Sequence, residues 1–244
     1  MTCIKALSMA TAIAASLTAN QALAHQAGDI FVRAGLATVA PDESSDGVAI
    51  PALDIAPIAG TEAQVDDNTQ PGLTITYMLS NKLGIELLAS TPFTHDISAN
   101  LNGYSPGLKV DAAEAKHLPP TLSAVYYPFA DSGSAFQPYA GLGLNYTIFF
   151  EEDVDSDLEA LTGTLAGASG PVPMKLKLDN SLGLALQLGA DYSLDKNWHL
   201  NASVRWIDIN TDATFNSALG KTITVDDVEI DPWVYQVNIG YKFR

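Results

Sequence analysis

Residues 136–148 read FQPYAGLGLNYTI, and apolar residues occupy every second position of this stretch, from Phe136 to Ile148. The positions between them carry polar residues, glycine or Tyr139. A period of two places successive side chains on opposite faces of a β-strand. The stretch therefore predicts a long strand with one apolar face and one mixed face.

Seven further stretches repeat this alternation, so we expect eight strands in all. They cover residues 30–37, 73–79, 84–90, 122–127, 182–192, 198–206 and 233–243. Eight alternating segments separated by turn or loop residues predict an all-β protein.

The lengths of the connections favour one architecture. Short turns are expected at residues 80–82, 128–135 and 194–197, and long connections at about 39–68, 93–115, 150–178 and 212–224. Because short and long connections alternate strictly, all the long ones emerge at one end. An outer-membrane barrel has short periplasmic turns and long extracellular loops, whereas a soluble sandwich has no reason for this asymmetry.

The two faces of the strands agree with a membrane location. One face is almost purely apolar on all eight strands, and aromatic residues stand near the strand ends. These are Tyr77, Tyr126, Phe136, Tyr146, Tyr192, Trp198, Trp206, Trp233, Tyr241 and Phe243. Such aromatic residues resemble the girdles at membrane interfaces, and a soluble eight-stranded barrel would have the reverse polarity. We therefore predict an eight-stranded antiparallel transmembrane β-barrel.

The predicted lumen is narrow and charged. Eight strands leave an interior that side chains nearly fill or that holds one small ligand, so a wide aqueous pore is excluded. Five charged residues fall on the inward face: Arg33, Glu86, Asp191, Arg205 and Lys242. Because an unpaired charge there is costly, we expect them to pair with one another. We interpret them as a structural plug; a polar floor that blocks ion flow is a compatible alternative.

Residues 1–24 are expected to be a cleaved signal peptide. Lys5 precedes an apolar run over residues 6–17, and Ala22-Leu23-Ala24 is typical of a cleavage site before His25. The apolar run is too short for a membrane anchor. These features predict export to the outer membrane of a Gram-negative bacterium.

Residues 25–244 are expected to form one barrel domain without disulfides, because the single cysteine of the chain is Cys3. Loss of Lys5 with the signal peptide changes the formal net charge from −16 to −17. Nucleic acid is not an expected partner of such an acidic protein, because phosphates require a basic surface.

The sequence carries no G-x-S-x-G elbow, H-E-x-x-H motif or Walker loop, so we expect neither an enzyme nor a cofactor. The four histidines, His25, His95, His117 and His199, are far apart in sequence. Because some barrel enzymes pair an exposed histidine with serine or aspartate, a lipid-modifying activity at His117 or His199 is a rival hypothesis.

The long connections mix acidic and apolar residues. The acidic residues of the first and third are Asp42, Glu43, Asp46, Asp54, Asp66 and Asp67, and Glu151, Glu152, Asp153, Asp155, Asp157 and Glu159. The spacing of a calcium loop is not met, so a solvated surface is favoured over a metal site. The apolar residues either build a vestibule above the lumen or only pack the loops together. They are Val48, Ile50, Leu53, Ile55, Ile58, Leu158, Leu161, Leu165 and Val172.

Residues 116–121, KHLPPT, place Pro119 and Pro120 where the second long connection enters the strand at 122–127. Proline lacks the N–H group that a sheet ladder needs, so it is confined to strand starts, edges and bulges. Two missing donors would leave the ladder to the preceding strand incomplete at the extracellular rim. The prolines are therefore a candidate edge of a lateral exit; plain strand initiation is the alternative.

Several segments together resemble the outer membrane protein W family, which includes AlkL-type proteins. They are HQAGD (25–29), VRAG (32–35), GIELLASTPF (84–93), HLPPT (117–121), PYAGLGLNYT (138–147), DINT (208–211) and DPWV (231–234). The similarity follows the whole predicted mature chain in order. Two features depart from the family: Arg244 follows the aromatic Phe243, and the first and third loops are longer and more acidic.

The resemblance implies a monomeric barrel for passive uptake of small hydrophobic molecules, with a closed periplasmic end and a sideways exit into the membrane. The expected partners are outer-membrane lipid and lipopolysaccharide, small hydrophobic solutes and the barrel-insertion machinery. Inward apolar groups predicted to contact the solute are Phe31, Met78, Leu88, Val125 and Tyr139. The alternative is a structural or adhesive surface barrel whose loops bind envelope or host partners.

Overall fold

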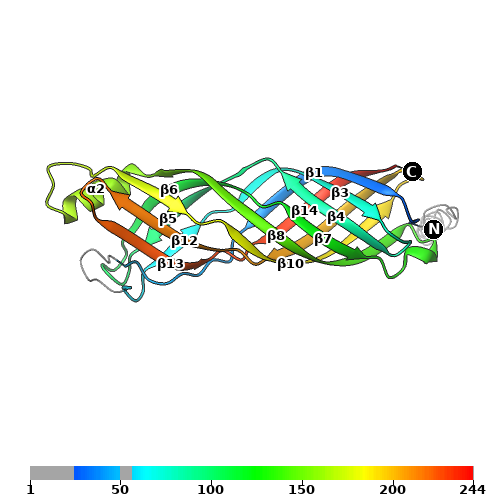
Figure 1. Ribbon diagram of the computed structural model, residues 1–244, viewed down its shortest axis with the longest axis horizontal. Helices are drawn as coiled ribbons and strands as arrows, with labels where there is room; N and C mark the ends of the chain where they lie inside the picture. Colours follow the sequence, from blue (N-terminus) through cyan, green and yellow to red (C-terminus); the bar gives the residue numbers. More distant parts are fainter. Residues whose placement is uncertain (1–24, 50–56, 244) are drawn as a thin grey trace, which may run out of the picture.

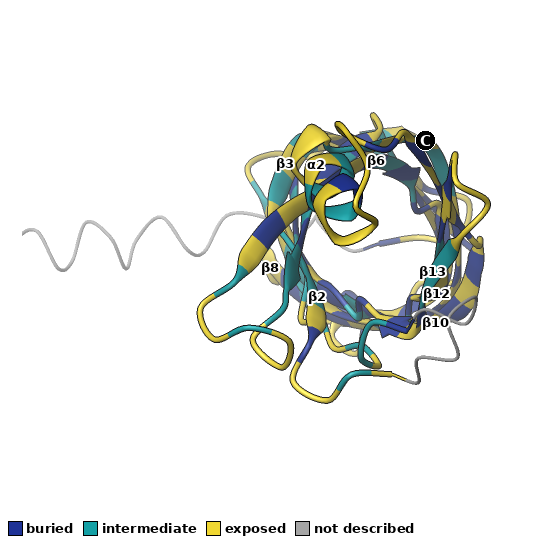
Figure 2. Ribbon diagram, turned by 90° about the vertical axis from the view of Figure 1, so that its left-hand side faces the viewer, coloured by how far each residue is buried: buried dark blue, intermediate teal, exposed yellow. Residues whose placement is uncertain are grey.

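Eight antiparallel strands close into a barrel in the computed structural model, which describes residues 25–49 and 57–243. In order around the ring they are β1 (Ile30–Ala40), β3 (Asn68–Met78), β4 (Leu83–Ser90), β7 (Thr121–Tyr126), β8 (Phe136–Val154), β10 (Ser181–Ser193), β11 (Trp198–Ile207) and β14 (Trp233–Phe243). Each strand pairs with the next, and β14 pairs with β1. Figure 2 looks at this closed ring from one end. The predicted eight-stranded barrel is confirmed.

The barrel is apolar outside and polar inside, as the alternation predicts. On β8, Leu142 and Leu144 are 57% and 58% exposed, whereas Asn145 and Thr147 are fully buried. A water-soluble protein would not expose such a continuous apolar surface, but a bilayer solvates it. Lipid offers no hydrogen bonds to the backbone, and this explains why the strands close on themselves.

Aromatic side chains mark the ends of the apolar band. Trp198 and Tyr241 lie on neighbouring strands with ring centroids 5.0 Å apart, and Phe243 lies 4.7 Å from Tyr241. At the other end of the same strand pair, Trp206 is directly opposite Trp233. Such rings prefer the membrane interface, so the two sets bracket the bilayer.

The long connections are not irregular loops, and here the prediction of eight strands joined by long loops is incomplete. The strands β5 (Phe93–Asn100) and β6 (Lys109–Leu118) form a hairpin that pairs with the C-terminal part of β8, residues 148–154. The short strand β2 (Glu62–Val65) pairs with β5. A second sheet contains β9 (Met174–Leu178), β12 (Asn210–Ser217) and β13 (Thr222–Glu229), and the helix α2 covers Ser156–Leu165. Figure 1 shows these elements extending the barrel at its left-hand end.

The sequence pattern did not predict this extension, and the reason is physical. Its outward side chains face water, so charged residues such as Asp96, Asp111 and Glu114 stand where barrel strands carry leucine. Register shifts at Ile97/Ser98 and Thr211/Ala213 also interrupt the alternation of faces. Alternation with an apolar outer face therefore identifies strands only within the membrane.

The opposite end carries the short connections and both described chain ends (Figure 1). Its turns follow β3, β7 and β10, and the turn after β7 contains a 3-10 helix at Ala130–Ser132. Short turns identify this end as periplasmic and the extension as extracellular. The predicted signal peptide, residues 1–24, and Arg244 lie outside the described residues. In the part of the chain that the structure describes, no helix is long and apolar enough to span a membrane.

The double proline interrupts the barrel wall on one side. The strands β6 and β7 follow one another along β8, from Leu118 opposite Ile148 to Thr121 opposite Asn145. On their other side, the ladder between β4 and β7 ends at Leu88 opposite Thr121. Pairing resumes only between β5 and β6, at Phe93 opposite His117. Residues 89–92 and 118–120 thus face one another without a ladder.

The carbonyl groups of the two prolines are satisfied from the β8 side. The Asn145 side-chain amide donates to the carbonyl oxygen of Pro119 at 3.0 Å, and the Thr121 hydroxyl also donates to it. The Tyr146 N–H donates to the carbonyl oxygen of Pro120 at 3.1 Å. The interruption is therefore one-sided: residues 118–120 lack a ladder to residues 89–92 but remain attached to β8.

Replacing Leu142 with arginine should destabilise the barrel by about 2–4 kcal/mol, because Leu142 faces lipid near the middle of the apolar band. The free energy of unfolding in urea, followed by tryptophan fluorescence in liposomes, measures this. Glu114→Arg is the control, since Glu114 points outward from the extracellular extension; its effect should stay within about 0.5 kcal/mol. Equal losses in the two variants would contradict the assigned membrane boundary.

Candidate functional site

A fully buried arginine on β1 organises the charged lumen. The two terminal nitrogens of Arg33 form ion pairs with Glu86 at 2.9 Å and with Asp191 at 2.8 Å. The same nitrogens donate to the hydroxyl oxygens of Thr76 at 2.7 Å and Tyr127 at 2.8 Å. Arginine presents five donors in a fixed fork, and here the lumen supplies acceptors on several sides.

A second buried arginine extends the network. Arg205 donates to Glu86 at 3.0 Å, so one carboxylate joins two guanidinium groups. It also donates to the side-chain oxygens of Gln187 and Gln236. The two arginines and their partners come from β1, β3, β4, β10, β11 and β14 and from Tyr127 directly after β7, so the network ties together opposite walls of the barrel.

Four of the five inward charges named from the sequence thus meet: Arg33, Glu86, Asp191 and Arg205. Lys242 does not join them; its ammonium lies 3.8 Å from Asp29, near the periplasmic end. The network also includes polar residues that the sequence interpretation did not assign to it, among them Tyr127, Gln187 and Asn201. Their inward position in the alternation was the available signal.

The five apolar residues predicted to contact a solute all point inward and are buried. Phe31, Met78, Val125 and Tyr139 pack with Tyr127 and Ala130 in one cluster. The Arg33 guanidinium lies over the rings of Phe31 and Tyr139, at 5.3 and 5.8 Å from their centroids. This cluster closes the periplasmic side of the network, and Leu88 lies outside it. A role for these residues as solute contacts stays a prediction.

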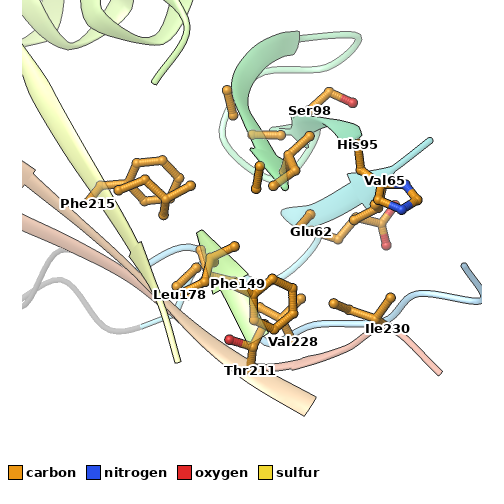
Figure 3. A pocket seen from close by; sticks show the side chains of 18 of the residues that line it. Glu62, Val65, His95, Ser98, Phe149, Leu178, Thr211, Phe215, Val228 and Ile230 are labelled. Atoms are coloured by element: carbon orange, nitrogen blue, oxygen red, sulfur yellow. The ribbon is translucent and has the colours of Figure 1, made fainter. Parts of the chain in front are cut away.

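An apolar chamber lies in the extracellular half. Its empty volume is about 820 Å³, including the space at its open side. The walls are formed by β2, β5, β6 and the upper part of β8 on one side, and by β9, β12 and β13 on the other (Figure 3). Labelled side chains such as Phe149, Phe215 and Val228 point into it. None of the five predicted contacts lines this chamber.

A vestibule of about 850 Å³ adjoins the chamber on the side of α2. The two cavities share Val48, Ala99, Ala112, Phe215 and Val225 in their linings, so they lie side by side. Apolar residues of the long connections line the vestibule: Val48, Ile58, Leu158, Leu161 and Leu165. Of the two readings of these residues, the structure favours a vestibule. Val172 is buried but is not among its lining residues, and Ile50, Leu53 and Ile55 lie outside the described residues.

Two histidines stand together in the chamber wall. The Nε2 atoms of His95 and His117 are 3.0 Å apart, and both side chains are buried. Both lie in the extension outside the membrane, where burial lowers the pKa of His95 and lowers the pKa of His117 to about 3. The pair is therefore uncharged at neutral pH.

This pair was missed because 22 residues separate its members in the sequence. They become neighbours only through the β5–β6 hairpin, in which Phe93 is opposite His117 and His95 is opposite Ala115. A hairpin assignment for residues 93–118 would have been the signal. Among the described residues, no group of three or more histidine, cysteine or acidic side chains could hold a metal ion.

A barrel with an apolar outside, a lumen closed by charges and long structured segments at one end defines a class, the small outer-membrane β-barrels. The family model for the OmpW family matches residues 26–243, and the chain belongs to this family. The family resemblance found in the sequence is confirmed.

Individual relatives agree with this assignment. Outer membrane protein W of Vibrio cholerae is 45% identical over 232 residues, covering 95% of this chain and 96% of the relative. The crystal structure of outer membrane protein OprG from Pseudomonas aeruginosa matches with a TM-score of 0.77 and 45% identity, covering 91% of this chain and 98% of that one. A more distant relative is the dibenzothiophene metabolism operon protein PahQ of Pseudomonas aeruginosa, 24% identical over 186 residues, or 76% and 77% of the two chains. The protein is an outer-membrane barrel in contact with lipid, and these relatives are outer-membrane barrel proteins and not enzymes.

Replacing Arg33 with leucine should cost about 3–5 kcal/mol of stability, because it leaves Glu86 and Asp191 buried with fewer partners. Urea unfolding in liposomes measures the loss. Lys242→Met is the matched control, since this lysine lies outside the network and its distance to Asp29 is long; it should cost at most about 1 kcal/mol. A loss for Arg33→Leu no larger than that of the control would contradict the central role of Arg33.

Proposed function

We infer that this protein mediates passive uptake of small hydrophobic molecules across the outer leaflet of the outer membrane. The observation that carries the proposal is the apolar chamber, which lies beside an apolar vestibule on the extracellular side. A solute would enter beside α2, pass the shared lining at Ala112 and reach the chamber above the charged network.

The energetics suit a downhill passage. Burial of apolar surface is worth about 25 cal/mol per Å², so a solute with about 200 Å² of apolar surface gains roughly 5 kcal/mol on leaving water. The bilayer offers a gain of the same kind. The chamber therefore shortens the aqueous path across the outer surface without holding the solute more tightly than the membrane does.

The periplasmic route is unfavourable for such a solute. The network of Arg33, Glu86, Asp191 and Arg205 crosses the lumen below the chamber, and the cluster around Phe31 lies beyond it. Breaking this network would leave buried charges unpaired, which is costly. We therefore assign the network the role of a closed floor in addition to its structural role.

A sideways exit at the double proline agrees with the interrupted ladder. Pro119 is buried and Pro120 is exposed on the outer face, so the interruption reaches from the lumen side to the outside of the wall. Here a solute can pass between residues 89–92 and residues 118–120, which share no ladder hydrogen bonds. The substrate class agrees with the name of the distant relative PahQ, which links that protein to the metabolism of dibenzothiophene.

The remaining partners follow from this role. The barrel acts as a monomer among outer-membrane lipid and lipopolysaccharide, and the barrel-insertion machinery places it there. An adhesive role of the extracellular end is the alternative, and removal of α2 separates the two. Adhesion lost with unchanged solute uptake would favour the alternative.

Filling the junction of the two cavities should abolish uptake. Ala112 is buried and lines both the chamber and the vestibule, so Ala112→Trp places a large ring in the passage. Uptake of a radiolabelled alkane or terpene by cells carrying this variant should fall to the rate of cells without the protein. Ala124→Trp, on the lipid-facing side of β7, is the control and should keep the uptake of the unaltered protein. If cells with and without the unaltered protein take up the solute equally, the proposed function is wrong.

Replacing Pro119 and Pro120 with threonine should restore backbone donors and close the interrupted wall. We expect uptake of the same solute to slow several-fold, while the midpoint of thermal unfolding stays the same or rises. Pro138→Thr is the control, because Pro138 lies within β8 near the periplasmic end and away from the interruption. Unchanged uptake in the double variant would make the prolines a plain strand start.

A further inference from the structure

We propose that the His95–His117 pair makes the chamber selective for apolar molecules that carry one hydroxyl donor, such as an alkanol or an alkylphenol. The proposal rests on the proposed uptake function and names a substrate class for the same chamber. The recognising atom is Nδ1 of His117.

The hydrogen bonds of the pair fix the position of each proton. His95 Nδ1 contacts the backbone carbonyl oxygen of Asp66, and a carbonyl can only accept, so His95 carries its proton on Nδ1. A neutral imidazole has one N–H, so His95 Nε2 is an acceptor. The Nε2 of His117, 3.0 Å away, must therefore be the donor. This leaves Nδ1 of His117 without a proton, as an acceptor.

That acceptor has no partner among the described residues. Nδ1 of His117 is buried without a hydrogen bond, and the residue is only 5% exposed. Its ring lies between the rings of Phe93 and Phe149, at centroid distances of 5.4 and 5.8 Å. An unsatisfied buried acceptor is unfavourable, and a ligand that donates to it removes this deficit.

Two other polar side chains of the chamber lining are already engaged, and the lining also includes Ser98. The Thr211 hydroxyl donates to the carbonyl oxygen of Asp179 at 2.7 Å, and the Glu62 carboxylate accepts from the Asn100 amide at 3.0 Å. The remaining lining is dominated by alanine, valine, leucine, isoleucine and phenylalanine. A ligand that fits is therefore apolar over most of its surface and donates one hydrogen bond.

The acceptor is held in place from both sides. His95 is fixed by the Asp66 carbonyl, and the Asp66 N–H in turn donates to the carbonyl oxygen of Asp96 at 3.1 Å. The ring of His117 is stacked on Phe149, with 18° between their planes. Such support keeps the tautomer and the ring orientation constant, as a selective contact requires. His117 is also two residues from Pro119, so a bound hydroxyl would sit beside the proposed exit.

Two isomers, one with and one without the hydroxyl donor, test this inference: 1-decanol and methyl nonyl ether. With the full-length protein in nanodiscs, and empty nanodiscs as the reference, the alcohol should bind about three- to tenfold more tightly than the ether, the usual worth of one neutral hydrogen bond. His117→Phe keeps an aromatic ring for stacking but removes the acceptor. It should lower the affinity for the alcohol to that for the ether and leave the ether unchanged.

A measurement on the unaltered protein does not depend on folding of the variant. The ¹⁵N resonance of His117 Nδ1 should shift when 1-decanol is added and stay in place with the ether. If both probes enter cells faster than in the absence of the protein, but the resonance does not respond and the preference is missing, this inference is wrong while the uptake function stands. If neither probe enters faster, the uptake function itself is wrong.

Discussion

The absence of hydrogen-bonding partners in lipid is the constraint on which the rest of this structure depends. Every backbone N–H and carbonyl in the hydrocarbon region must find its partner within the wall. Eight strands meet this demand by closing into a ring, with β14 paired to β1 and β8 paired to β10. Closure with so few strands makes the lumen narrow, and this in turn decides what the inward residues can do.

The narrow lumen accounts for the charged network. Charged side chains on opposite walls are close enough to meet, and burial makes an unpaired charge costly, so Arg33 and Arg205 share Glu86 while Arg33 also holds Asp191. Glycine makes room for bulky partners: a Cβ at Gly189 would come within 2.4 Å of the Tyr139 ring. Side chains thereby fill much of the periplasmic half of the lumen, and the apolar chamber lies above it.

The same constraint explains how far the sequence could predict the molecule. Within the membrane the outer face must be apolar, so the alternation predicted the strands and their inward faces. It also predicted that inward charges pair, and four of them do: Arg33, Glu86, Asp191 and Arg205. Lys242 was the exception, because its place near the periplasmic end lets it reach Asp29 instead. Outside the membrane neither face is forced to be apolar, and register shifts in β5–β6 and β12–β13 break the period. The alternation therefore did not predict the extension, the chamber or the His95–His117 pair, since each depends on which strands pair.

The proposed exit and the proposed hydroxyl site both lie at the boundary between the membrane-spanning barrel and the extracellular extension. Below Leu88 and Thr121 the ladder between β4 and β7 is continuous, as lipid requires. Above Phe93 and His117 the wall belongs to the water-facing extension and need not be continuous. A sideways exit can exist only where the wall no longer needs a continuous ladder but lipid is still near. The level of Pro119 and Pro120 meets both conditions. A hydroxyl held at His117 would lie at that level, where the polar group of an amphiphile meets the membrane interface while its apolar body is already aligned with the lipid. Selection of donor-bearing solutes and their release sideways are, on this view, two consequences of one position in the barrel wall.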